Sequence, residues 1–170
     1  MSDSETREIF VTGLKNAHAM ENQALSIMKP QVKRIENYPD IAARLEEHIR
    51  ETEGQIGRLE EILTSLAENN SSLKDAALSF TGSMAALGHT VAGDEILKNS
   101  MANFAFENFE IAAYKSLITI AELGGFKGLI APLQVNLDEE VAMAAWLERN
   151  LRPTTIKFAS LKEAGQTAKV

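Results

Sequence analysis

A helical pattern decides the fold of this protein, and it is clearest in residues 94–123, DEILKNSMANFAFENFEIAAYKSLITIAEL. Apolar residues recur there every three or four positions, as on one face of an α-helix. Asp94 suits the position before a helix, and Gly124 and Gly125 suit its end. We therefore expect a helix over 94–123. Its predicted inward stripe contains Leu97, Ser100, Phe104, Glu107, Ile111, Tyr114 and Ile118.

The same period predicts three more helices, at 5–36, 39–68 and 126–150. Pro30 should kink or split the first, Pro39 suits the first turn of the second, and Pro153 should close the last. Residues 73–93 are less regular and are interpreted as a crossover between the second and third helices. Two helix pairs joined by a long crossover are typical of a ferritin-like four-helix bundle. We expect an all-α bundle over residues 1–153 and a tail over 154–170, either mobile or docked on it.

Composition excludes several kinds of function. The 170 residues carry a net charge of −7 without a cluster of Lys or Arg, so we expect neither nucleic acid nor an anionic membrane as a partner. The chain has no Cys, which excludes disulfides, thiolate nucleophiles and zinc–thiolate sites. No secretory signal pattern and no apolar run of ~20 residues are present, so a cytoplasmic location is expected.

Several acids lie where apolar residues are expected. Glu21, Glu107 and Glu140 lie on the apolar stripes of the first, third and fourth helices, and Glu110 flanks Glu107 one turn later. The second helix offers four polar residues along or beside its stripe, His48, Glu51, Thr52 and Gln55. Each group is near the middle of its helix, so an antiparallel bundle would bring them to one level.

Converging carboxylates of this kind favour a metal site. A buried ionised carboxylate is costly, and several together stay protonated unless a cation neutralises them. Carboxylates with an imidazole or amide oxygen suit iron or manganese. The alternative is that each Glu lies at the edge of its stripe and extends its carboxylate into water.

Four segments resemble a known family: AMENQ at 19–23, HIRETEGQIGRLE at 48–60, ENFEIAAY at 107–114 and LDEE at 137–140. Together they resemble the YciE/YciF family of ferritin-like bacterial stress proteins, over roughly residues 5–150. The resemblance implies a rubrerythrin-like bundle, often dimeric, with two iron or manganese ions per chain. The metal-site residues that it implies, with two candidates from the second helix, are Glu21, Glu51, Glu107, Glu110, Glu140, His48 and Gln55.

This sequence departs from the family pattern in the second and fourth helices and at Asn108, which replaces a His often found there. The usual Glu-x-x-His is missing from both the second and the fourth helix. Gln55 stands where the second helix would supply His, and Met143 lies three residues after Glu140.

Two functions compete on this evidence. The first is a stress-response protein whose dinuclear, carboxylate-bridged site reacts with oxygen or peroxide, with Tyr114 or His48 tuning the metal surroundings. The second is a non-enzymatic bundle that has lost the metal and acts through dimerisation or partner binding. The sequence does not decide whether the protein is an enzyme.

A homodimer is expected because several apolar residues lie away from the inward stripes. These residues are Ile9, Val11, Ile27, Val141 and Trp146. The alternative is that the crossover and the tail cover them.

Overall fold

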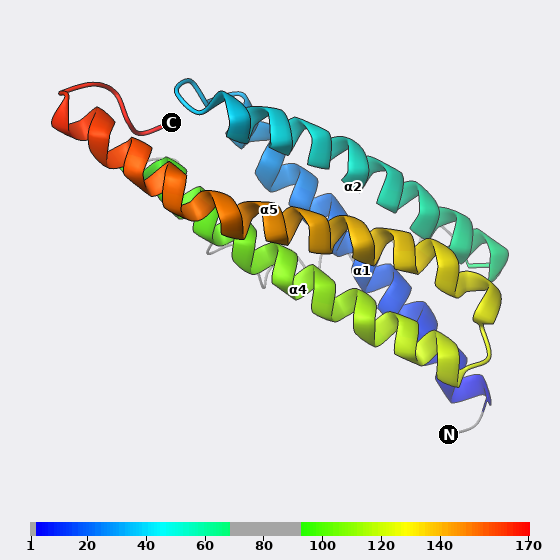
Figure 1. Ribbon diagram of the computed structural model, residues 1–170. Coiled ribbons are helices and arrows are strands. Elements are labelled where there is room, and N and C mark those ends of the chain that lie inside the picture. The colour runs from blue at the N-terminus through cyan, green and yellow to red at the C-terminus, as the bar shows by residue number, and fades with distance from the viewer. Residues whose placement is uncertain (1–2, 69–92) are drawn as a thin grey trace.

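The computed structural model describes residues 3–68 and 93–170. Within them the chain forms four long α-helices and one short 3-10 helix (Figure 1). The helices are α1 (Asp3–Val32), α2 (Pro39–Ser65), α4 (Glu95–Leu123), η2 (Lys127–Leu129) and α5 (Ile130–Glu163). Short turns join α1 to α2 and α4 to α5, which makes two antiparallel pairs. The predicted all-α, ferritin-like bundle is confirmed; the predicted crossover lies almost wholly outside the described residues.

The helix boundaries follow local chemistry. Pro39 occupies the first position of α2, where a missing backbone N–H costs nothing. Gly125 follows α4 with a φ of 75°, a conformation that glycine adopts without steric cost. Phe126, just after this turn, stacks on Phe10 of α1 with ring centroids 4.7 Å apart. This contact fixes one end of the bundle.

The buried face of α2 differs in part from the apolar stripe that its sequence predicts, which is Ile41, Leu45, Ile49, Thr52, Ile56, Leu59, Ile62, Leu63 and Leu66. Ile49 and Ile56 are only partly buried, whereas His48, Thr52 and Gln55 are at most 1% exposed. The helix is therefore rotated so that polar groups face the bundle interior at its middle. Leu45 and Leu59, at 1% and 0% exposed, bracket this polar segment.

The predicted end of the last helix was wrong. α5 continues through Pro153 to Glu163. Proline removes the hydrogen bond to the carbonyl four residues earlier. Pro153 and Arg149 are both exposed, so water can replace that bond and the helix persists. Pro30 likewise lies inside α1, at an exposed position.

The residues after α5 connect two distant parts of the chain. Ala168 is 1% exposed, and its carbonyl accepts a hydrogen bond of 2.8 Å from the hydroxyl of Tyr38. The backbone N–H of Ile96 donates to the carbonyl of Lys169 at 2.8 Å. Figure 1 shows the C-terminus beside the α1–α2 turn. No helix in the described part of the chain is long and apolar enough to cross a membrane.

Candidate metal centre

Four carboxylates and one imidazole meet in the interior of the bundle. Glu21 comes from α1, His48 from α2, Glu107 and Glu110 from α4, and Glu140 from α5. All five are buried, the most exposed being Glu107 at 2%. The structure therefore brings together the acids that the stripes of α1, α4 and α5 predicted. The alternative, in which each Glu extends its carboxylate into water, is wrong because these side chains are buried.

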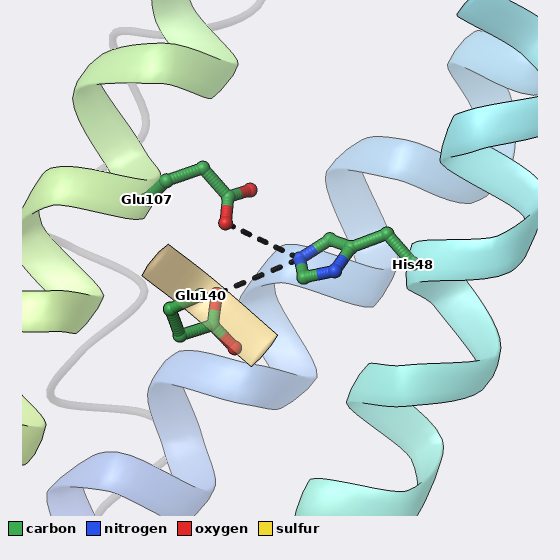
Figure 2. A group of neighbouring side chains, drawn as sticks. All are labelled: His48, Glu107 and Glu140. Atoms are coloured by element: carbon green, nitrogen blue, oxygen red, sulfur yellow. Dashed lines mark ion pairs between the residues drawn. The ribbon is translucent and has the colours of Figure 1, made fainter. Parts of the chain in front are cut away.

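His48, Glu107 and Glu140 form the tightest group (Figure 2). The Nε2 atom of His48 lies 3.3 Å from Oε2 of Glu107 and 3.5 Å from Oε2 of Glu140. One ligand atom from each residue lies within 4.8 Å of the other two. This buried group could hold a metal ion.

Glu51 lies outside this group and contacts the other side of the imidazole. Its Oε2 is 2.7 Å from Nδ1 of His48 and accepts hydrogen bonds of 3.0 and 3.1 Å from Arg44. The Glu51 side chain is 24% exposed. A carboxylate on the second ring nitrogen fixes the orientation of a metal-binding histidine. Glu51, implied as a ligand by the resemblance, is therefore placed to orient His48.

A hydrogen-bonded chain holds Glu21. The hydroxyl of Tyr114 donates to Oε1 of Glu21 at 2.6 Å, and Asn136 donates to the oxygen of Tyr114 at 2.9 Å. Tyr114 and Asn136 are both 0% exposed. Tyr114, predicted to tune the metal surroundings, thus contacts one of the acids directly.

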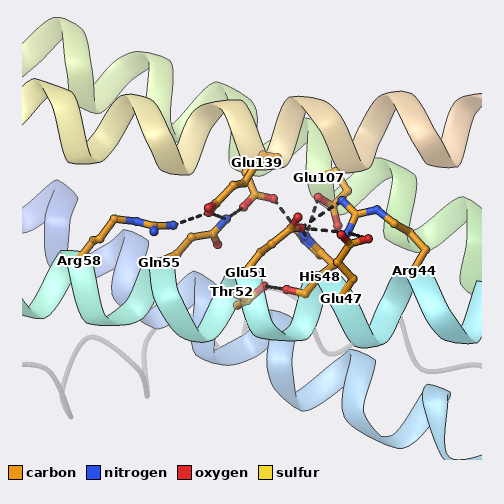
Figure 3. A network of polar contacts seen from close by, with 10 residues as sticks. Arg44, Glu47, His48, Glu51, Thr52, Gln55, Arg58, Glu107 and Glu139 are labelled. Atoms are coloured by element: carbon orange, nitrogen blue, oxygen red, sulfur yellow. Dashed lines mark hydrogen bonds and ion pairs between the residues drawn. The ribbon is translucent and has the colours of Figure 1, made fainter.

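Gln55 links the centre to a more exposed ion pair (Figure 3). Its Nε2 donates to Oε2 of Glu139 at 3.0 Å and also to Glu140. Arg58 pairs with Glu139 and donates to Asn136. The adjacent acids Asp138 and Glu139 are typical of a solvated helix face, so the sequence predicts no contact between Glu139 and the centre and gives Arg58 no role. Arg58 lies three residues after Gln55, on the same face of α2, and this spacing was the available signal.

Burial and mutual repulsion shift the pKa values of the acids of the centre. Burial raises the pKa of Glu21 to about 8, against the opposing effects of the Tyr114 hydrogen bond and the charge of His48. Burial and neighbouring carboxylates raise the pKa values of Glu110 and Glu140 well above the usual range. Burial alone would lower the pKa of His48, but Glu107 and the surrounding carboxylates raise it to about 10.

Several buried oxygens of the centre have no hydrogen-bond partner. Both carboxylate oxygens of Glu110 and one each of Glu21, Glu107 and Glu140 are buried without a hydrogen-bond partner. Oε1 of Gln55 is buried without a partner as well. Buried polar atoms normally have partners, and unsatisfied ones call for an explanation such as an ion. Hard oxygen donors with one imidazole nitrogen fit iron or manganese.

Comparison with known proteins gives consistent matches. A family described as "Domain of unknown function (DUF892)" matches residues 5–160. Protein YciF of Escherichia coli K12 is 25% identical over 150 residues, 84% of this chain and 87% of that protein. A crystal structure of a Xanthomonas campestris pv. campestris protein is 27% identical, with a TM-score of 0.78 over 93% of this chain and 99% of that one. The crystal structure of the E. coli stress protein YciF, at 22% identity, has a TM-score of 0.66 over 86% and 94% of the two chains.

Proposed function

Because this chain belongs to the DUF892 family and is similar to YciF, we propose that it is a metal-binding stress-response protein. The predicted resemblance to the YciE/YciF proteins is confirmed. The proposed ions are iron or manganese, up to two per chain. The observation that carries the proposal is the set of five buried carboxylate oxygens without a hydrogen-bond partner, two of which form ion pairs with His48.

Glu21, Glu107, Glu110, Glu140 and His48 would hold the ions. Bound iron or manganese supplies the redox chemistry for a reaction with oxygen or peroxide. The protein contributes orientation and charge. Tyr114 fixes Glu21 through its 2.6 Å hydrogen bond, and Glu51 fixes the ring of His48 through its contact with Nδ1. Residues that fix ligands in this way commonly affect metal affinity by about 10–100-fold.

Glu139, Gln55 and Arg58 connect this centre to the outside of the bundle. Glu139 and Arg58 have side chains that are 24% and 26% exposed, whereas Gln55 is fully buried. The amide of Gln55 contacts both Glu139 and Glu140, and so spans this boundary. With its Oε1 atom buried without a hydrogen-bond partner, Gln55 can also offer a ligand atom from α2.

Anaerobic titration with ferrous iron tests the proposal. Calorimetry follows the titration, and we expect saturable binding of up to two ions per chain. This binding should be lost when both Glu21→Gln and Glu140→Gln are introduced. Glu60→Gln is the matched control, since Glu60 is exposed and contacts His18 outside the centre. Absence of saturable binding in the unaltered protein would refute the metal site.

The ion pairs of His48 support a second function. With its pKa raised to about 10, a protonated His48 lies between Glu107 and Glu140 and can neutralise them without a metal. The missing Glu-x-x-His motifs favour the same conclusion. Under this alternative the protein is a non-enzymatic bundle that acts through dimerisation or partner binding, and the ferrous titration separates the two functions.

We also propose that two copies associate. Ile9 and Val141, expected at the surface, are 45% and 44% exposed. Val11 is 6% exposed and packs within the chain, so it no longer supports this proposal. Larger exposed apolar side chains also occur on α4, where Met101 and Phe109 are 55% and 47% exposed. Light scattering at micromolar concentration should give twice the mass of one chain, and a single-chain mass would refute the dimer.

A further inference from the structure

A partly exposed acid on α5 is connected to the candidate metal centre through one buried amide. Oε2 of Glu139 accepts a hydrogen bond of 3.0 Å from Nε2 of Gln55, and the same Nε2 atom donates to Oε1 of Glu140. Figure 3 shows Glu139 next to both Gln55 and Arg58. Because the two carboxylates contact one nitrogen atom, a single side chain separates a partly exposed acid from a buried acid of the centre.

The chemistry of these groups suits the transfer of a divalent cation. Moving a cation out of water is costly unless protein oxygens replace its hydration shell. Glu139 supplies a carboxylate on the outer side, and Glu140 supplies one inside. Between them, Oε1 of Gln55 is buried without a hydrogen-bond partner, so a rotation of this amide offers a third oxygen. The three residues thus form a series of oxygen ligands that leads from the outside to the centre.

Arg58 covers the outer end of this series. Its guanidinium pairs with Glu139, and its Nε donates to Oδ1 of Asn136. Because the guanidinium is always positively charged, it occupies the carboxylate and repels an incoming cation. A Cβ added at Gly54 would lie 3.6 Å from Nη1 of Arg58, so the glycine leaves space beside the guanidinium. Arg58 is partly exposed and can therefore turn into water without movement of the helices.

Glu51 is also partly exposed and near the centre, but it offers a poorer route. Its Oε2 lies 2.7 Å from Nδ1 of His48 and accepts two hydrogen bonds from Arg44. The ring of His48 therefore stands between Glu51 and the carboxylate of Glu107. An imidazole supplies no oxygen to a passing cation, and moving this ring aside would remove a proposed metal ligand.

We propose that divalent cations enter the centre through Glu139 and Gln55, and that Arg58 blocks this entry route while it pairs with Glu139. The inference rests on the proposed function, because it needs a centre that binds metal. A residue on an entry route lowers the barrier for binding and for release alike. Its loss should slow both rates by the same factor and leave the affinity unchanged, whereas loss of a metal ligand weakens the affinity.

Stopped-flow mixing with Co²⁺ measures the association rate, because the visible absorption of Co²⁺ changes when protein ligands replace its water. Glu139→Gln should slow association severalfold, and Arg58→Gln should accelerate it severalfold. Calorimetry should give an unchanged Co²⁺ affinity for both variants. Circular dichroism checks that each variant is folded. If Arg58→Gln does not fold, Glu139→Gln alone decides the entry route, because Glu139 is partly exposed.

Two exposed residues provide matched controls. Asp138→Asn removes the same charge one residue before Glu139, but Asp138 contacts Gln134 rather than the centre. Arg50→Gln removes a positive charge from the exposed face of α2. Neither should change the association rate at about 1 M salt, where a Debye length of about 3 Å screens long-range attraction. Equal rates for Glu139→Gln and Asp138→Asn would overturn the entry route, and an unchanged rate in folded Arg58→Gln would overturn its blocking role.

The proposed function and the entry route fail in different ways. Absence of saturable Co²⁺ binding in the unaltered protein would refute both. Saturable binding with equal association rates in Glu139→Gln and Asp138→Asn would refute the entry route alone. A weaker affinity with an unchanged association rate in Glu139→Gln would also refute the route, because Glu139 would then act as a ligand of the bound ion.

Discussion

The buried acids predict an unusual pH dependence for the stability of the metal-free protein. In the unfolded chain Glu21 loses its proton near its ordinary pKa of 4.5, whereas in the folded protein it keeps the proton up to about pH 8. Between these values the folded state binds the extra proton, so the free energy of unfolding falls as pH rises. The stabilisation is fully present below pH 4.5 and is lost by about pH 8.

The size of the effect follows from that interval. At ~1.4 kcal/mol per pH unit, an interval of about 3.5 pH units for Glu21 corresponds to a loss of about 5 kcal/mol. Glu110 and Glu140 act in the same direction, because their pKa values are also raised by burial and repulsion. His48 adds to the loss above pH 6.5, its ordinary pKa, since its folded pKa is about 10. Typical domains are stable by about 5–15 kcal/mol, so the effect is large.

Groups with lowered pKa values do not oppose this trend in the same window. Ion pairs with His48 and Arg44 lower the pKa of Glu51 against the effect of its burial, and pairs with Arg34 and Lys169 do so for Glu95. Their contributions are present above pH 4.5 and are lost only as pH falls through the lowered pKa values. Acid unfolding from these groups therefore begins below the range of the measurement.

Urea unfolding of chelator-treated protein between about pH 5 and 8 measures the trend. Glu21→Gln should reduce the slope of unfolding free energy against pH by up to ~1.4 kcal/mol per pH unit, which corresponds to one proton, because an amide does not titrate in this range. Saturating manganese should remove most of the loss in the unaltered protein by neutralising the carboxylates. A free energy of unfolding that stays constant across this range would refute the clustering of these acids.

Two further perturbations test individual contacts. Tyr114→Phe removes the hydrogen bond to Glu21 and should lower the free energy of unfolding by about 1–3 kcal/mol, measured in urea; an unchanged midpoint would mean that the contact is not formed. Gly57→Ala should raise the free energy of unfolding by about 1 kcal/mol, and with it the thermal midpoint, because an added Cβ meets nothing within 4 Å. Gly13→Ala is the matched comparison and should gain less, since its Cβ would lie 2.8 Å from the buried Leu117; equal gains would contradict this packing.

Periodicity predicted the helices and most of the acid positions. Glu21, Glu107 and Glu140 each lie on the same helix face as the large apolar residues of their own helix, as Glu21 does with Leu14. Residues on that face are buried when the helices pack. The antiparallel arrangement of helix midpoints then predicted one shared level. Both steps need only the geometry of a single helix and the order of the helices.

The second helix shows where this reasoning stops. Ile49 and Ile56 compete with His48 and Gln55 for the buried face, and a rotation of the helix by one residue exchanges the two sets. Only packing against α1 and α5 decided that the polar set faces inward. In this orientation Glu51 lies at the edge of the buried face, with its Oε2 atom 2.7 Å from Nδ1 of His48.

Taken by itself, the amino-acid sequence determined the all-α class, the helix pairs and the acids of α1, α4 and α5, because these depend on residue spacing along the chain. The tertiary structure decided the rotation of α2, the roles of Glu51 and Glu139, and the continuation of α5 through Pro153. These features depend on contacts between residues far apart in the sequence, and on which side of a helix meets water, which spacing along one helix does not encode.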